Sequence, residues 1–216
     1  MTIQKPIPRG ELHRKLIHIS SSSIPIGYYF LDKNLVLGII IPLLIVLLLF
    51  ELLKYRIKFL HGLYIKLFKD MLREHEYDKQ IFRVNGASWV LIGDILCILI
   101  FPKLIAIGGM LLLSLADSIS AIAGQLFAKK YYTKNRSYLG TTVFLVIGII
   151  IVTLTPKYFS NSLEYFIGYA AIVITAVSDS ISLPVDDNLI IPIVFCGALY
   201  VLYLLFFPFI FTLKLF

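Results

Sequence analysis

The chain has 216 residues, of which 59% are hydrophobic and 15% are charged, and its mean hydropathy is +0.88. This composition excludes an ordinary soluble domain, and apolar runs of about 20 residues predict helices that span a bilayer. The formal net charge of +7 does not indicate a nucleic-acid partner, because the basic residues lie mostly in loops beside apolar runs. Anionic lipid headgroups or a polyphosphate ligand are the expected partners.

Seven spans are predicted, so we expect an all-α, multi-pass membrane bundle that forms one domain over residues 1–216. The approximate ranges are 16–31, 34–53, 86–101, 104–127, 140–155, 163–179 and 189–213. Sixteen of the 20 basic residues fall on one side, and the positive-inside rule makes that side, with the N-terminus, cytoplasmic. The polar start of the chain argues against a cleavable signal peptide. Pro192 and Pro208 favour a kink in the seventh span.

Residues 56–73 are amphipathic rather than uniformly apolar. Leu60, Leu63 and Tyr64 share a helical face, and Lys58 and Lys66 lie off it. This pattern predicts a helix in the plane of the membrane interface. It either anchors the bundle or guides a lipid substrate towards it.

The fourth predicted span carries an intramembrane acid, Asp117, and a stripe of small residues at every fourth position: Ala116, Ser120, Gly124 and Ala128. The stripe predicts close approach of another helix. An acid inside a bilayer usually marks a site or a pathway. The alternative is that Asp117 pairs with a basic residue or a nearby serine and only specifies packing.

A basic loop follows this span, with Lys129, Lys130, Lys134 and Arg136. The loop predicts a phosphate site in which Lys130 and Arg136 supply charge. The small or hydroxyl-bearing residues expected to let the backbone and hydroxyls approach the phosphates are Gly124, Ser137, Gly140 and Thr141.

A second polar cluster precedes the first span: Glu11, Arg14, Lys15 and His18 share one helical face. Together at the mouth of a span they indicate phosphate binding, with Glu11 and His18 as supporting residues. The alternative is that Arg14 and Lys15 are ordinary membrane anchors, that Glu11 pairs with Lys15, and that His18 bonds a neighbouring helix.

A third cluster lies between the last two predicted spans and comprises Asp179, Asp186, Asp187 and Asn188. Neighbouring carboxylates without a basic residue among them favour a hard divalent cation such as Mg²⁺, to which Asp117 is a further candidate ligand. The alternative is that the acids are solvated and that Asn188 caps the last helix. Asp94 is intramembrane and is a possible supporting residue, whereas Glu51 is expected at the interface and Glu164 on the outer side.

These clusters provide what phosphoryl transfer requires, namely cations for the phosphates, carboxylates for a metal and a carboxylate near the attacking hydroxyl. A site in a membrane face implies a lipid alcohol as acceptor. Asp117 is then either a metal ligand or the base. In a straight helix it lies about 15 Å from the cytoplasmic end, so a broken helix or a wet cavity on that side is predicted.

Several segments, in this order, resemble the CTP-dependent lipid kinases, a family that includes dolichol kinase, phytol kinase and the diacylglycerol kinase that uses CTP. The segments are ELHRKLIH (11–18), LREHE (72–76), NGASWVLIG (85–93), SLADSISAIAG (114–124), RSYLGTT (136–142) and VSDSISLPVDDNLIIP (177–192). The resemblance implies a membrane kinase that moves the γ-phosphate of CTP to a lipid hydroxyl. The preference for cytidine comes from the resemblance alone.

The chain departs from the family at several positions. Leu139 stands where polyprenol and phytol kinases often have Glu, Asp179 replaces a Glu, and Arg136 replaces a Lys. Gln125 and Ala128 replace a basic residue and a glycine. The missing acid at 139 and the LREHE segment are closer to the diacylglycerol kinase branch than to dolichol kinase, so diacylglycerol is the first candidate acceptor and a polyprenol the second.

Two other functions are compatible with parts of this pattern. A phosphatidate cytidylyltransferase uses the same nucleotide and metal, but its paired-glycine and Asp-Arg signature is missing near the C-terminal span. A transporter with Asp117 and Asp94 in its pathway predicts a repeat between two halves, and the sequence shows none.

Overall fold

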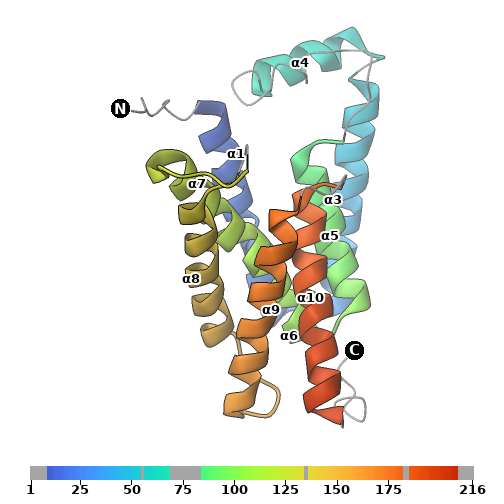
Figure 1. The fold of residues 1–216 in the computed structure, drawn as a ribbon. Coiled ribbons are helices and arrows are strands. Elements are labelled where there is room, and N and C mark those ends of the chain that lie inside the picture. Colours follow the sequence, from blue (N-terminus) through green and yellow to red (C-terminus); the bar gives the residue numbers. More distant parts are fainter. Residues whose placement is uncertain (1–8, 55, 69–83, 134–135, 182–184, 209–216) are drawn as a thin grey trace.

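The computed structural model describes residues 9–54, 56–68, 84–133, 136–181 and 185–208, and these residues form helices and connecting loops (Figure 1). Most helices run up and down in one bundle. Helix α4 (Lys58–Phe68) lies across one end of it. The all-α prediction is confirmed for the described residues.

The first predicted span, 16–31, is two helices instead of one. Helix α1 (Arg9–Ser20) ends at a serine pair, and α2 (Ser23–Phe30) starts immediately after it. The Ser21 hydroxyl donates to the carbonyl of His18 at 2.6 Å, so the side chain engages a backbone acceptor that a continuing helix would use. Pro25 lies in the first turn of α2, where its missing N–H costs little.

Within the described residues, four helical segments are long and apolar enough to cross a membrane. They are α3 (Lys33–Leu53), the continuous segment Lys103–Phe127, α9 (Ser162–Ser180) and α10 (Asp187–Phe206). Helices α5 (Gly86–Ile100) and α8 (Tyr138–Leu154) are apolar but shorter. The chain is therefore a membrane protein, while the count of seven spans and the cytoplasmic N-terminus stay predictions.

The segment Lys103–Phe127 changes helical geometry in its middle. It consists of α6 (Lys103–Leu111), the π-helical η3 (Leu112–Asp117) and α7 (Ser118–Phe127). Asp117 is the last π-helical residue. Short π-helical segments inside α-helices occur frequently at functional sites, because the wider turn re-aims the side chains.

The ends of α4 and α10 differ from the predicted ranges. Helix α4 covers the first part of the predicted 56–73 helix, and the remainder lies outside the described residues. Its Tyr64 is buried beneath the ammonium of Lys54, which lies 3.7 Å from the ring centroid. Helix α10 contains Pro192 and ends at Phe206, two residues before Pro208.

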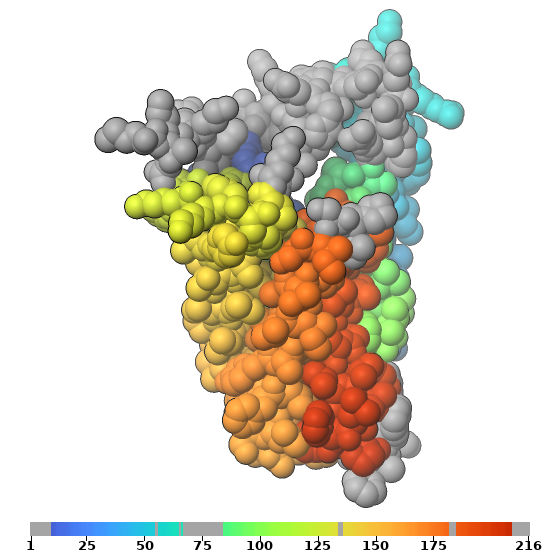
Figure 2. Space-filling model, in the orientation of Figure 1, coloured from blue at the N-terminus to red at the C-terminus, as the bar shows by residue number. Residues whose placement is uncertain are grey.

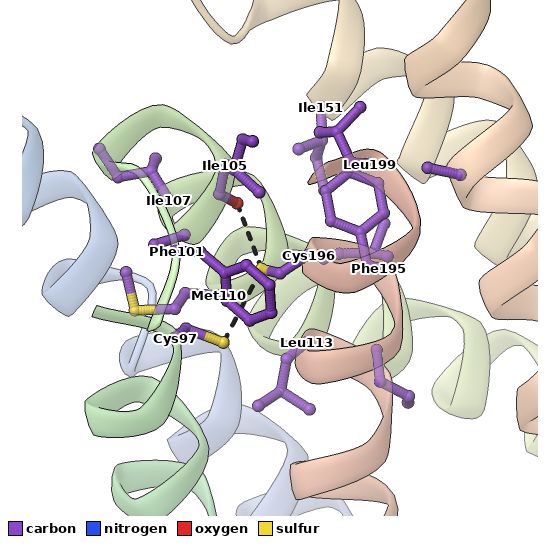
Figure 3. Close-up of a cluster of buried hydrophobic side chains, with 14 of the residues drawn as sticks. Cys97, Phe101, Ile105, Ile107, Met110, Leu113, Ile151, Phe195, Cys196 and Leu199 are labelled. Atoms are coloured by element: carbon purple, nitrogen blue, oxygen red, sulfur yellow. Dashed lines mark hydrogen bonds between the residues drawn. The ribbon is translucent and has the colours of Figure 1, made fainter. Parts of the chain in front are cut away.

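The core lies where α5, α6 and α10 meet (Figure 3). Cys97 and Cys196 are fully buried there, with their sulfur atoms 3.8 Å apart, and the Cys196 thiol donates to the carbonyl of Ile105. The sulfur of Cys196 fills the space where a side chain on Gly109 would lie, so a residue larger than glycine would separate α6 from α10. Both cysteines are free thiols. Helices α8, α9 and α10 form a continuous face in the space-filling view (Figure 2).

Candidate active site

The three polar clusters of the sequence meet at one end of the bundle, called here the site end. It contains α1, the loop between α7 and α8, the last turn of α9, and the first turns of α5 and α10 (Figure 1). The opposite end, called the far end, carries Lys33, Lys103 and Lys157. For the described residues, the basic side chains that the sequence assigns to opposite sides of the membrane therefore lie at opposite ends of the bundle.

Lys15 and Asp117 form an ion pair that joins α1 to η3. The ammonium of Lys15 donates to Asp117 Oδ2 at 2.8 Å, and both side chains are largely buried. Glu11 bonds Arg14 instead of Lys15, at 3.3 Å. The expected Glu11–Lys15 alternative is therefore wrong, because Asp117, although distant in sequence, lies within reach of Lys15.

Arg136 bridges two carboxylates of the third cluster. Its Nη2 lies 2.6 Å from Asp179 Oδ1 and donates to Asp187 Oδ2 at 2.7 Å. The contact with Asp179 is an ion pair without hydrogen-bond alignment. Burial by itself would lower the pKa of Arg136, but Asp179, Asp187 and Asp117 outweigh burial and hold that pKa above its ordinary value. The guanidinium therefore stays charged at any physiological pH.

The described part of the basic loop is held in place by its own backbone and by two tyrosines, of which Tyr131 donates from its hydroxyl to the carbonyl of Gly124 at 3.2 Å. Tyr131 and Ser137 form an isolated antiparallel bridge. The hydroxyl of Tyr132 lies 2.8 Å from that of Thr141 on α8 and 3.0 Å from that of Ser180 on α9. Tyr132 was not among the predicted site residues. Its only signal in the sequence is a tyrosine within a run of basic residues.

Gly124 and Gly140 form a close contact between α7 and α8. A side chain on Gly124 would lie 2.9 Å from the hydroxyl oxygen of Ser137 and 3.5 Å from Cα of Gly140. The Ser137 hydroxyl accepts from the N–H of Gly140 at 3.0 Å and caps α8. All four residues of the small-residue stripe are buried, so close helix approach is confirmed. A phosphate role for Gly124, Ser137 and Gly140 stays a prediction.

Asn188 connects α10 to α5. Its side chain donates to the carbonyl of Gly86 at 3.4 Å, while Asp186 accepts from the N–H of Asn188 and caps α10. The cap predicted for Asn188 is therefore provided by Asp186. A side chain on Gly93 would lie 2.8 Å from the carbonyl oxygen of Asn188, so this glycine sets the spacing of the two helices.

His18 lies one turn beyond Lys15 on α1. If Gly86 carried a Cβ atom, that atom would lie 3.7 Å from Nε2 of His18 and 3.4 Å from the side-chain amide nitrogen of Asn188. The Nδ1 atom of His18 is buried, and no described residue bonds it. His18 is therefore at the junction of α1, α5 and α10.

Other predicted residues are placed apart from these contacts. Lys129 and Lys130 are exposed on the loop. Asp94 is 2% exposed in the middle of α5, and its carboxylate pairs with none of the described residues. The LREHE segment lies outside the described residues.

The predicted metal site has no preformed cluster. Among the described residues, no group of three or more His, Cys, Asp or Glu side chains is close enough to hold a metal ion. The guanidinium of Arg136 lies between Asp179 and Asp187, and Lys15 occupies Asp117. As arranged, these carboxylates do not fit a Mg²⁺ ion, and Mg²⁺ stays a prediction.

The predicted wet cavity also stays a prediction. Asp117 is 6% exposed and faces α1 instead of lipid. A small apolar cavity that the structure shows lies at the far end, where Leu104, Val152 and Tyr158 contribute to its lining.

Two acids for which the sequence predicted only a position along the membrane normal are buried inside the protein. Glu51, expected at the interface, is 1% exposed and accepts from the hydroxyl of Ser88 at 2.8 Å and the N–H of Asn85 at 3.3 Å. Glu164, expected on the outer side, is 1% exposed at the far end. It accepts from three backbone N–H groups and from the hydroxyl of Tyr203.

Comparison with known proteins gives distant relatives. An uncharacterised protein of Rickettsia prowazekii is 24% identical over 192 residues, which cover 86% of this chain and 91% of the relative. CTP-dependent diacylglycerol kinase 1 of Eremothecium gossypii is 27% identical over 158 residues, covering 71% of this chain and 48% of the kinase. The Saccharomyces cerevisiae protein of the same name is 26% identical over 163 residues, covering 74% of this chain and 55% of the kinase.

The chain thus matches about half the length of each of these two kinases. No family model matches the chain, and no solved structure matches it. Together with the apolar helices, this distant similarity supports a lipid kinase of the membrane.

Proposed function

We propose that the chain is a membrane kinase that transfers the γ-phosphate of CTP to the hydroxyl of a lipid alcohol, with diacylglycerol as the first candidate acceptor and a polyprenol as the second. The observation that carries the proposal is the meeting of Lys15, Asp117, Arg136, Asp179 and Asp187 at one end of an apolar bundle. The similarity to two CTP-dependent diacylglycerol kinases supports the donor and the acceptor.

The cations are the proposed phosphate ligands. The ammonium of Lys15 has three N–H donors, and Asp117 is the only described residue that it bonds. In Arg136, Nη2 contacts both carboxylates, whereas Nη1 and Nε donate no hydrogen bond to a described residue. The carboxylates therefore hold each cation in place while further donors remain for phosphate oxygens. Arg14 and Lys130 add charge at the rim.

The polar residues around these cations are proposed to position the nucleotide. Thr141 and Tyr132 brace the loop that carries Arg136, and Asn188 fixes α10 against α5. Transfer of a phosphoryl group depends mainly on such positioning and on neutralising the charge that develops on the phosphate oxygens. We place this site on the cytoplasmic face, where CTP is available.

The test uses the purified full-length protein in mixed micelles with Mg²⁺ and CTP labelled on the γ-phosphate. Diacylglycerol, a polyprenol and phytol are offered side by side. Label in one lipid, with release of CDP, establishes the kinase and names its acceptor. Pyrophosphate release with phosphatidate would instead establish a cytidylyltransferase, and flux across vesicles without nucleotide would indicate a transporter.

Two matched variants on α8 control this assay. Thr141→Val removes a hydroxyl at the site, and Thr153→Val removes one about 18 Å further along the same helix. We expect Thr141→Val to raise KM for CTP severalfold and Thr153→Val to leave it unchanged. Asp117→Asn is expected to abolish labelling in protein that stays folded.

A further inference from the structure

His18 carries a buried polar atom that nothing in the described fold satisfies. Its Nδ1 is buried and has no hydrogen-bond partner among the described residues, although Lys15 and Asp117 are near enough to act on the imidazole. A buried polar group without a partner destabilises the fold, and such groups are rare in native structures. This cost is removed if a ligand at the site end supplies the missing partner.

The position of His18 makes it a candidate for contact with a substrate. It shares a helical face with Glu11, Arg14 and Lys15, the residue that bonds Asp117. The Nε2 atom of His18 and the side-chain amide nitrogen of Asn188 both lie next to Gly86 at the start of α5. The imidazole is therefore in the middle of the clusters from α1, η3, α5 and α10.

Asp117 is poorly suited to accept a proton. Its Oδ2 already accepts a charge-assisted hydrogen bond of 2.8 Å from Lys15. An opposite charge at this distance stabilises the ionised carboxylate and weakens it as a base. Of the two roles left open for Asp117, metal ligand or base, the role of base is therefore excluded. Asp117 serves instead in binding and in charge compensation.

An imidazole is the group that most often moves protons near neutral pH, and the neutral form has one nitrogen free to accept. The charged groups that act on His18 are Lys15 and Arg14 from its own helix, Asp117 from η3 and Asp186 before α10. Burial favours the neutral imidazole before the reaction, and the two cations add to this effect. The two carboxylates compensate the imidazolium that forms when it accepts a proton.

Helix α1 also gives a lipid access to this position. Leu12, Leu16 and Ile17 are exposed large hydrophobic residues on the part of α1 that does not carry the polar face. An α-helix with its side chains is about 10 Å across. An acceptor in the bilayer beside α1 is therefore within one helix width of the imidazole.

We propose, on the basis of the proposed kinase function, that His18 is the general base that takes the proton from the lipid hydroxyl. The hydroxyl donates to Nδ1, and its oxygen attacks the γ-phosphorus of CTP. The bond from the γ-phosphorus to the oxygen that bridges it to the β-phosphorus breaks, and CDP leaves with that electron pair. The hydroxyl proton passes to Nδ1, and the imidazolium later releases it to water.

The deciding variant is His18→Asn, because an asparagine amide oxygen can accept a hydrogen bond near the position of Nδ1 but takes no proton. General-base catalysis contributes about 10²–10⁴-fold. We expect kcat for γ-phosphate transfer to fall by at least about 100-fold, with KM for CTP and the thermal stability nearly unchanged. In His18→Ala, added imidazole restores part of the rate, and the acidic limb of the wild-type pH–rate profile is absent from the residual activity.

Two results would overturn the assignment. A His18→Asn enzyme that keeps kcat within about threefold would show that proton transfer does not need this residue. A higher KM for CTP at unchanged kcat would make His18 a phosphate ligand. Both of these results require a wild-type enzyme that is active. A wild-type enzyme that is inactive on every lipid alcohol would instead refute the proposed kinase function itself.

Discussion

The ammonium of Lys15 and the carboxylate of Asp117 meet at 2.8 Å although 102 residues separate them in the sequence. This pair attaches the first helix to the π-helical segment in the centre of the bundle. It explains how an acid inside an apolar segment remains compatible with folding, because a buried charge needs a partner. It also places a cation beside the residue that the sequence singles out most strongly.

A double-mutant cycle on this pair should show strong coupling. Lys15→Met leaves a buried carboxylate and Asp117→Asn leaves a buried ammonium, so each single change is expected to destabilise the fold by about 3 kcal/mol. The double variant should lose less than the sum of the two, because neither charge then remains unpaired. Thermal unfolding in detergent micelles measures all four proteins. Strictly additive losses would show that the pair does not interact.

Arg136 is expected to be needed both for stability and for nucleotide binding. Arg136→Gln leaves Asp179 and Asp187 facing each other without a cation and should weaken CTP binding by at least about tenfold. Arg136→Lys keeps the charge but loses the planar fork, so it should restore binding only in part. The control is Lys129→Gln, an exposed basic residue of the same loop. Equal losses in the two loop variants would indicate a general charge effect.

The two acids that Arg136 bridges should differ in importance. Asp187 is 57% exposed and Asp179 is 14% exposed. Because water screens an exposed ion pair, Asp187→Asn is expected to cost less than about 1 kcal/mol of unfolding free energy, and Asp179→Asn more. Chemical denaturation of the two variants compares them. The reverse order would mean that exposure does not set the strength of these contacts.

Gly93 should tolerate no side chain. Alanine there would put Cβ 2.8 Å from the backbone oxygen of Asn188, so α5 and α10 must move apart. We expect Gly93→Ala to lower the stability by more than about 2 kcal/mol and to raise KM for CTP, because Asn188 shifts with α10. Gly197→Ala is the matched control, since nothing lies within 4 Å of that position and alanine favours a helix. A stable, active Gly93→Ala protein would contradict this packing.

Glu164 is expected to matter for folding and not for the reaction. It accepts four hydrogen bonds at the far end, including one of 2.7 Å from Tyr203. Glu164→Ala leaves these donors unsatisfied and should cost about 3 kcal/mol or more, whereas Tyr203→Phe, which removes one donor, should cost about 1–2 kcal/mol. The specific activity of the folded fraction should equal that of the wild type. A change in KM for CTP would mean that the two ends are coupled.

The positions of most helices, and the assignment of the connecting loops to the site end or the far end of the bundle, follow from the local sequence. The apolar runs predicted α3, α5, α8 and α9 to within about two residues at each end, because burial of a helix in lipid depends on its own composition. The small-residue stripe correctly predicted a close helix contact, which Gly124 and Gly140 provide. The split of the first span at Ser21 was missed, since it depends on a hydroxyl that bonds the backbone instead of on hydropathy.

The sequence by itself determined that this is an all-helical membrane protein whose acids and cations gather in three clusters. Only the tertiary structure decided which charges meet. Glu11 bonds Arg14 while Lys15 reaches Asp117, Arg136 joins two acids, and Glu164 becomes a buried acceptor. The reason is physical: hydropathy and helix periodicity are properties of neighbouring residues, whereas the partner of a buried charge is set by which helices pack side by side.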